Sequence, residues 1–241
     1  MISLKSLGKR FKGVVAVDGV SLDLDRGEVV GLIGPNGSGK TTMLAMASGV
    51  LRPTEGRIEI DGTDLTGKGP TQFARGGVGR TFQQVRLFEG FTVAETIEVG
   101  AVAKGHSPEE IEEPMRILGL DEHRDRHAST LAYGLQRRVE IARALAGRPQ
   151  YLLLDEPAAG MNEAESKNLL EAIQKVVSSF GCGVLIVEHD LHLIMTLCDR
   201  VHVLSEGSTI AEGSPDQVRT DPAVIETYIG NTNLENHGRD E

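Results

Sequence analysis

The sequence predicts an α/β fold whose sheet-forming core carries an inserted helical lobe. An apolar run, Glu28–Ile33, leads into a glycine-rich turn and then a helix from about Lys40, which is the strand–turn–helix opening of an α/β nucleotide-binding core. Two later apolar runs, Tyr151–Leu154 and Val184–Val187, have the continuous hydrophobicity of buried parallel strands. Residues 84–129 contain helix-like segments and few β-branched runs, and they predict the lobe.

The remaining elements of the first half follow from local patterns. Three short strands are expected in the first sixty residues, at Ile2–Lys9, Val20–Asp25 and Gly56–Ile60. Within the lobe, Ser107, Pro108 and Glu110 form the start signal of a helix: a capping serine, a proline at the first position and a glutamate at the third.

The second half returns to alternating helices and strands. Asn162 and Glu165 form a capping box that begins a helix with one apolar face, and this helix ends near Gly181. Another helix follows His189, and then two strands connected by a turn are expected at Arg200–Leu204 and Ser208–Ala211. The polar residues Asn231–Glu241 are expected to be frayed.

Composition indicates a folded protein without a membrane span. The 241 residues suit one large domain or a domain with an inserted lobe, and 39% of them are hydrophobic. No stretch reaches the roughly 18 apolar residues that a span needs, and the N-terminus lacks the apolar core of a signal peptide. The formal net charge of -10 disfavours nucleic acid as a partner. We therefore expect a cytoplasmic protein that reaches the membrane only through a partner.

The glycine-rich turn matches the phosphate-loop pattern GxxxxGK[ST]. Its glycines let backbone N–H groups turn toward phosphate oxygens, and the helix N-terminus adds the positive end of its dipole. Lys40 is expected to reach the β- and γ-phosphates, and the Thr41 hydroxyl to hold Mg²⁺. The expected nucleotide contacts in this segment are Gly34, Pro35, Asn36, Gly37, Ser38, Gly39, Lys40, Thr41 and Thr42.

Two carboxylates and a histidine follow the later apolar strands. Asp155 stands at a strand end, where it can bind Mg²⁺ through water, as the acidic partner of a phosphate loop does. Glu156 lies one residue beyond and can polarise the attacking water. His189 ends the next strand, which is expected to lie beside the nucleotide-binding strands, so we expect it to contact the γ-phosphate.

These residues resemble the ATP-binding cassette (ABC) family of P-loop NTPases over nearly the whole chain. The phosphate loop and Asp155-Glu156 correspond to its Walker A and Walker B elements, and His189 corresponds to its switch histidine. Gln83 resembles the Q-loop glutamine, which in the family contacts Mg²⁺ and links the core to a transmembrane partner. Phe11 falls where the family places an aromatic ring against adenine.

The family's signature loop corresponds to Leu131–Leu135. In the family this loop covers the nucleotide held by the opposing subunit of a closed dimer, so the resemblance implies nucleotide contacts from Ala132 and Gly134. Ala132 replaces a serine whose hydroxyl would meet the γ-phosphate, and a hydrogen bond to a charged group is worth about 1.5–3 kcal/mol. Gly134 keeps its backbone N–H.

The resemblance also implies a division of the chain. Residues 1–83 and 136–230 would form the catalytic core, a mixed and parallel sheet with an antiparallel β subdomain. Residues 84–135 would form the helical lobe, which ends in the signature loop. ATP and Mg²⁺ are the implied cofactors. The implied partners are a second ABC ATPase subunit, identical or a sister, two transmembrane permease subunits, and indirectly an extracytoplasmic solute-binding protein.

Several departures from the commonest family pattern are similar to one subgroup, the ATPase pair of branched-chain amino acid importers. They are the segment Pro157–Asn162, Tyr133 in the signature loop, Arg80-Thr81-Phe82-Gln83, and the ending Asp221–Gly230. Members of the subgroup also serve the uptake of amides, urea and other small molecules. Within the pair, these segments are similar to the subunit that usually carries the longer helical lobe. The lobe of this chain is short, so the sequence leaves the assignment to one of the two paired subunits open.

Two alternative functions stay open at this point. The first is the motor of a lipopolysaccharide-type exporter, whose cassettes have a similar carboxy-terminal ending but usually keep the serine of the signature loop. The second is a non-transport cassette protein of translation or DNA repair. The single cassette and the charge of -10 disfavour the second alternative.

Overall fold

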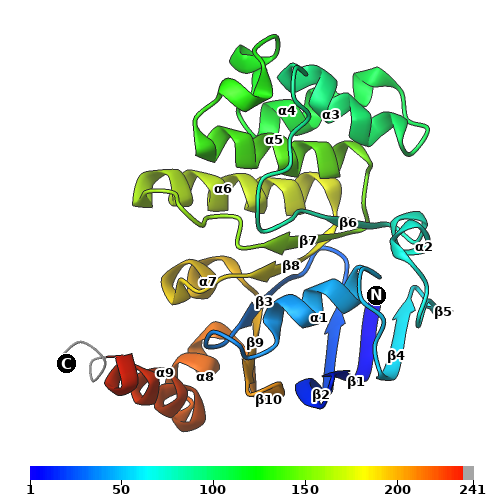
Figure 1. Cartoon of the computed structure of the whole chain (residues 1–241). Coiled ribbons are helices and arrows are strands. Elements are labelled where there is room, and N and C mark those ends of the chain that lie inside the picture. Colours follow the sequence, from blue (N-terminus) through cyan, green and yellow to red (C-terminus); the bar gives the residue numbers. More distant parts are fainter. Residues whose placement is uncertain (236–241) are drawn as a thin grey trace.

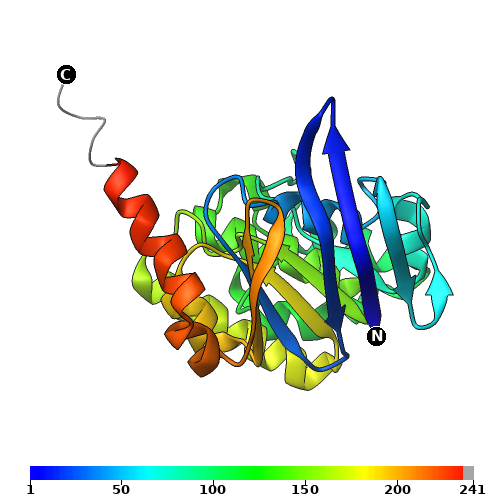
Figure 2. The same ribbon diagram turned by 90° about the horizontal axis from the view of Figure 1, so that it is seen from below.

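The computed structural model describes residues 1–235, and its strands form two sheets (Figures 1 and 2). The smaller sheet is antiparallel, has the strand order β2-β1-β4-β5, and begins at the N-terminus. Its strands are β1 (Ile2–Phe11), β2 (Val14–Leu24), β4 (Glu55–Ile60) and β5 (Thr63–Asp64). The antiparallel β subdomain that the sequence predicts is therefore present.

The larger sheet has the order β10-β9-β3-β8-β7-β6. Strands β9, β3, β8, β7 and β6 run parallel, and β10 returns antiparallel to β9. All carboxyl ends of the parallel strands therefore meet at one edge, where ligands bind in open α/β sheets. The bounds are β3 (Val29–Ile33), β6 (Val78–Arg80), β7 (Tyr151–Asp155), β8 (Gly183–Val187), β9 (Arg200–Ser205) and β10 (Ser208–Gly213).

Helix α1 (Lys40–Ala47) lies between the two sheets (Figure 1). Its buried residues Met43 and Leu44 share one hydrophobic cluster with Leu4 of β1 and with Val30 and Leu32 of β3. The alternate residues of β3 point to the opposite face of the larger sheet, as the two-residue period of a strand requires. The phosphate loop is thus held from both sides by packed elements.

The opposite face of the larger sheet is covered by α5 (Tyr133–Ala146), α6 (Glu163–Phe180) and α7 (Leu191–Leu197). Helix α6 confirms the predicted capping box, because Asn162 accepts from the Glu165 N–H at 2.9 Å and Glu165 bonds back. The helix ends at Gly181, which has a positive φ. The predicted apolar face is buried or partly buried.

A group of short helices lies beyond α5 and α6 at the top of Figure 1. It contains α3 (Val93–Val102), α4 (Glu112–Ile117) and the 3-10 turns η1 (Pro108–Ile111), η2 (Asp121–His123) and η3 (Ala128–Thr130). The remaining helices are α2 (Pro70–Arg75), α8 (Pro215–Thr220) and α9 (Pro222–Glu235). Within residues 1–235, no helix is both long and apolar enough to cross a membrane.

The structure corrects two predicted boundaries near the ends of elements. Strand β2 begins at Val14 rather than Val20, because Lys12 and Gly13 both have positive φ and form a two-residue turn that pairs Phe11 with Val14. Residues 231–235, which were predicted to fray, continue α9 without a proline to stop it. Residues 236–241 of that prediction lie outside the described part of the chain.

The predicted helix start at Ser107 is also corrected. Residues 108–111 form the 3-10 turn η1, and the α-helix begins only at Glu112. The capping box cannot close, because the Ser107 hydroxyl bonds the Glu109 carboxylate and lowers its pKa. The Glu110 carboxylate is turned to Arg148 instead of the backbone of Ser107.

We expect Asn162→Ala to lower the free energy of unfolding by about 1 kcal/mol, because the first turn of α6 loses its N-cap acceptor. Denaturant titration of the full chain measures the change. Asn168→Ala is the matched control: Asn168 is exposed in the middle of the same helix, so the same change should leave stability equal or slightly higher. Equal losses in the two variants would contradict the capping role.

Candidate functional site

The phosphate loop connects β3 to α1, and its shape depends on glycine. Gly34, Gly37 and Gly39 have φ values of 151°, 80° and 104°. A Cβ on Gly34 would overlap the Leu204 carbonyl oxygen, and one on Gly39 would lie 2.6 Å from the Ala16 carbonyl oxygen. Other residues would therefore strain the loop or push it off its supports.

Hydrogen bonds from neighbouring elements hold the loop in place. The Gly207 N–H, in the turn between β9 and β10, donates to the Ser38 carbonyl at 3.1 Å, and the Asp18 N–H donates to the Gly207 carbonyl at 2.8 Å. The Tyr228 hydroxyl of α9 hydrogen-bonds the backbone of Gly34. These bonds fix the loop in place, so its remaining N–H groups need little reorganisation to receive an anion.

Lys40 lies across the loop. Its Nζ donates to the carbonyl oxygens of Gly34 at 2.7 Å and Pro35 at 2.9 Å, and the residue is buried. Burial lowers the pKa of Lys40, and the carboxylates of Glu156 and Asp155 act in the opposite direction. A buried ammonium bonded only to neutral carbonyls is a strong site for a phosphate.

One face of the loop opens into a cavity of about 250 Å³. The cavity brings the predicted loop residues together with two predicted residues from distant segments. Its lining consists of Ala16, Asn36, Gly37, Ser38, Gly39, Lys40, Thr41, Thr42, Gln83 and Glu156. Gln83 Nε2 donates to Glu156 Oε2 at 3.1 Å. The Q-loop and the Walker B end therefore meet at the phosphate loop.

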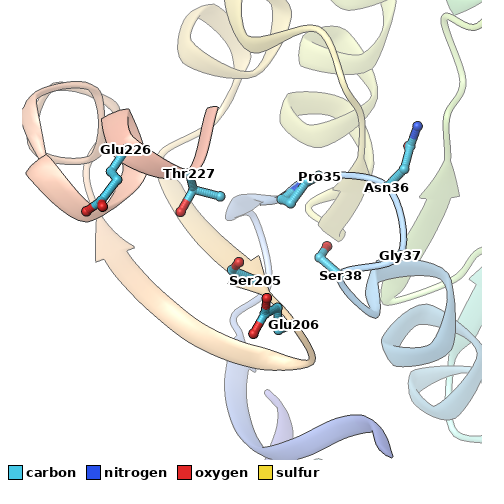
Figure 3. A pocket seen from close by; sticks show the side chains of 8 residues that line it. All are labelled: Pro35, Asn36, Gly37, Ser38, Ser205, Glu206, Glu226 and Thr227. Carbon is cyan, nitrogen blue, oxygen red and sulfur yellow. The ribbon is translucent and has the colours of Figure 1, made fainter. Parts of the chain in front are cut away.

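The other face of the loop opens into a separate cavity of about 330 Å³, which lies between the β9–β10 turn and α9 (Figure 3). Glu206 of the turn and Glu226 of α9 contribute carboxylates to its wall. Two carboxylates repel a polyphosphate. The nucleotide therefore belongs in the cavity that contains Lys40.

Asp155 is buried at the end of β7, and only one of its two carboxylate oxygens has a partner among the described residues. Its Oδ2 lies 3.2 Å from Arg80 Nη2, while its Oδ1 is buried without a hydrogen-bond partner among the described residues. Burial raises the pKa of Asp155, and Arg80 opposes that shift. Arg80 is fixed in turn by Ser48, whose Oγ accepts from its Nη1 at 2.8 Å. The orphaned oxygen fits a site for Mg²⁺ or its bound water.

Glu156 has a left-handed backbone, with φ 47°. Its N–H donates to the Val187 carbonyl at 2.9 Å, which holds the residue in this conformation. A non-glycine residue with positive φ costs energy and is found often at functional sites. Here the turn directs the carboxylate to Gln83 and the cavity.

His189 follows β8, which lies between β3 and β7 as predicted. Its side chain is 65% exposed, and its Nδ1 lies 3.7 Å from Glu188 Oε2. Glu188 is buried, and its Oε1 accepts from the Ala158 N–H at 2.8 Å. Burial raises the pKa of Glu188, and this N–H opposes the shift. Glu188 thus connects the histidine segment to the loop after Glu156.

Seven predicted site residues do not line this cavity, namely Gly34, Pro35, Asp155, His189, Phe11, Ala132 and Gly134. Ala132 is the N-cap of α5, and Gly134 in the first turn faces Met161 and Glu165 of the same chain. That this loop serves an opposing subunit stays a prediction. Phe11 is 44% exposed at the end of β1, and Lys9 Nζ lies 5.1 Å from its ring centre.

The sequence reasoning missed Arg80, Arg137 and Glu188, which support the site from behind. Each is a charged residue that is buried or nearly so. Glu188 directly follows the predicted apolar strand Val184–Val187, and a charge in such a place was the available signal. Arg80 adjoins no predicted apolar segment. Arg137 gave no such signal, because charged residues surround it in the sequence.

Comparison with known proteins agrees with this geometry. Residues 17–159 match the family model described as ABC transporter, and residues 208–232 match one described as branched-chain amino acid ATP-binding cassette transporter. The chain is 40% identical to the high-affinity branched-chain amino acid transport ATP-binding protein LivG of Escherichia coli (strain K12), covering 95% of this chain and 98% of that one. Identity and coverage are the same for BraF of Pseudomonas aeruginosa.

Solved structures agree as well. A crystal structure of an ABC transporter cassette in its ADP conformation has a TM-score of 0.87 and 31% identity, and the match covers 95% of this chain and 98% of that one. A dimeric bacterial ABC transporter cassette has a TM-score of 0.81 and 27% identity, over 89% of this chain and 99% of that one. The fold, the nucleotide cavity and these matches together show that the chain belongs to the ABC transporter family and is an ATP-binding, ATP-hydrolysing cassette of that family.

Proposed function

We propose that this cassette drives an importer of branched-chain amino acids or related small polar or amide solutes. The observation that carries the proposal is the cavity in which the phosphate loop, Gln83 and Glu156 meet. The carboxy-terminal match at residues 208–232 and the 40% identity to LivG and BraF support this class of solute.

In the proposed mechanism the chain's residues mainly position groups and neutralise charge. Lys40 leaves its two carbonyl partners for the β- and γ-phosphates, and the loop N–H groups bind the remaining oxygens. Thr41, Gln83 and Asp155 would hold Mg²⁺, which when bound neutralises the charge of the phosphates. Glu156 orients the attacking water and accepts its proton, and His189 steadies the γ-phosphate.

The mechanism needs a second cassette. The signature-loop residues Ala132 and Gly134 do not line the chain's own cavity. By the resemblance to the family, they would cover the nucleotide of an opposing subunit, and a partner's loop would cover this one. Phe11 would stack on the adenine from its place at the end of β1. Hydrolysis would then reopen the dimer.

Two permease subunits would receive the movement at the helical lobe, residues 84–135. Phe88 and Phe91 follow the Q-loop segment and are 43% and 40% exposed. A mainly apolar groove of about 430 Å³ lies between Phe91 and the α3 residues Glu95, Glu98, Val99, Val102 and Ala103. Exposed aromatic rings beside such a groove suit a docking site for a membrane subunit, which would hold the chain at the inner face of the membrane.

A second candidate is the motor of a lipopolysaccharide exporter. The chain is 35% identical to the lipopolysaccharide export system ATP-binding protein LptB of Haemophilus influenzae, over 95% of this chain and 97% of that one. The importer is favoured because the identity to LivG is higher and the carboxy-terminal segment matches the branched-chain family. Reconstitution with permeases encoded beside this chain, and assay of amino acid uptake, tests the choice.

We expect Glu156→Gln to bind ATP with nearly unchanged affinity and to lose turnover by about 10²–10⁴-fold, because the amide cannot accept the proton of the attacking water. Phosphate release and fluorescent-nucleotide titration measure the two quantities. Glu163→Gln is the matched control, since Glu163 is exposed at the start of α6. Near-wild-type turnover of Glu156→Gln would exclude the assigned role.

We expect the Glu156→Gln variant to dimerise when Mg·ATP is added, which light scattering measures. We expect the additional change Ala132→Ser to lower the dissociation constant of this dimer at least about tenfold. The serine hydroxyl restores a hydrogen bond to a charged phosphate oxygen, worth about 1.5–3 kcal/mol. Ala103→Ser, at an exposed alanine of the lobe, is the control and should change nothing. A protein that binds ATP and stays monomeric in both variants would instead require a sister cassette.

A further inference from the structure

The segment after β6 is held to α5 by three charged side chains on one face of that helix. Arg137, Glu140 and Arg143 are spaced three residues apart, so they share a face. Arg137 donates to the carbonyls of Phe82 and Gln83, and Arg143 Nη1 donates to the Arg86 carbonyl at 2.7 Å. Hydrogen bonds from α5 side chains to the backbone of the Q-loop therefore tie the position of this loop to that of α5.

Arg137 also reaches the Walker B turn. Its Nη2 donates to the Glu156 carbonyl at 3.4 Å as well as to the Gln83 carbonyl. Glu156 and Gln83 are the pair whose side chains meet in the nucleotide cavity. A single guanidinium thus holds the backbones of both residues whose side chains face the reacting phosphate.

The same arginine lies one turn from the signature loop. Its guanidinium lies 5.7 Å from the ring centre of Tyr133, the first residue of α5, and α5 begins directly after Ala132. A movement of the α5 N-terminus is therefore transmitted through a rigid helical turn to the guanidinium. No flexible segment separates the loop from the two backbone positions.

Arg137 is only 1% exposed, and such a buried charge must be paired. Its partner is Glu140, also 1% exposed, whose Oε2 lies 3.2 Å from Arg137 Nη1. Burial raises the pKa of Glu140, and Arg137 and Arg143 oppose the shift. The planar guanidinium serves the carboxylate and three carbonyls at once, whereas the ammonium of lysine has its three donors on one nitrogen and cannot span these four acceptors. The site is thus specific for arginine.

We propose that Arg137 is a positioning residue that couples the signature loop, which serves the nucleotide of the opposing cassette, to Gln83 and Glu156, which serve the chain's own nucleotide. The inference rests on the proposed dimeric mechanism. Engagement of the signature loop at one nucleotide shifts α5, and Arg137 carries the Q-loop and the Glu156 turn with it. The two composite sites then hydrolyse ATP cooperatively.

Two variants of the full chain test the coupling. Arg137→Lys keeps the charge beside Glu140 and removes the multiple hydrogen bonds. Arg137→Met removes the guanidinium with all its hydrogen bonds, while Glu140 keeps an ion pair with Arg143, whose Nη2 lies 3.7 Å from Glu140 Oε1. Arg138→Ala is the matched control, because Arg138 is the next residue of α5 and its Nη1 bonds the Leu118 carbonyl at 3.3 Å, within the lobe.

The readouts are the Mg·ATP dependence of the ATPase rate, fluorescent-nucleotide binding and thermal melting. For both Arg137 variants we expect kcat to fall about tenfold, the rate equivalent of one charged hydrogen bond. The Hill coefficient should fall to about one, while the Kd for nucleotide changes less than about twofold. Arg138→Ala should keep all three values, and the melting temperature shows that each variant is folded.

Several results would overturn the inference. They are an unchanged kcat and Hill coefficient in a folded Arg137 variant, a lower kcat with unchanged cooperativity, non-cooperative hydrolysis by the wild type, or loss of the fold in both variants. The last result would make Arg137 a residue of the fold only. A wild-type protein without ATPase activity would instead contradict the proposed function, so the two failures are distinguishable.

Discussion

The register of three parallel strands is the constraint on which the site depends. Leu32 of β3 pairs with Val187 of β8, and Val187 pairs with Asp155 of β7. Neighbouring strands lie only about 5 Å apart, so the phosphate loop, the two carboxylates and the histidine segment emerge side by side. The Val187 carbonyl also accepts from the Glu156 N–H, so the same residue that sets the register fixes the strained turn that directs Glu156 to the cavity.

Buried charges are the second recurring feature, and each has a partner that fits its role. Lys40 is bonded to neutral carbonyls, which a phosphate can replace. Asp155 has one oxygen with Arg80 and the other orphaned, which leaves room for a metal ligand. Arg137 bonds three backbone carbonyls and Glu140 through its two Nη atoms, so it suits positioning rather than ligand binding, although its buried Nε has no partner among the described residues.

The geometry also leaves the chain incomplete by itself. The first turn of α5 has an alanine N-cap without a side-chain hydrogen bond, and its residues do not line the chain's own cavity. A helix N-terminus of this kind offers its donors and dipole to an anion from outside. Arg137, near this surface, bonds the backbone of Gln83, and Glu188 bonds the Ala158 N–H in the loop after Glu156. In the proposed dimer, communication between the two nucleotides would therefore run through backbone contacts as well as through ligand-binding side chains.

The sequence by itself determined the α/β class, the phosphate loop, the α6 capping box and the candidates Asp155, Glu156 and His189, because each depends on local spacing and polarity. Gln83 came from the resemblance to the ABC family. Backbone angles and competition between hydrogen bonds were beyond it. The start of β2 depended on two positive φ angles, and the 3-10 turn after Ser107 depended on competing bonds to Glu109 and Arg148. Only the tertiary structure decided the roles of Arg80, Arg137 and Glu188. Their roles come from hydrogen-bond partners more than 15 residues away, and such long-range contacts leave no periodic signal in a sequence.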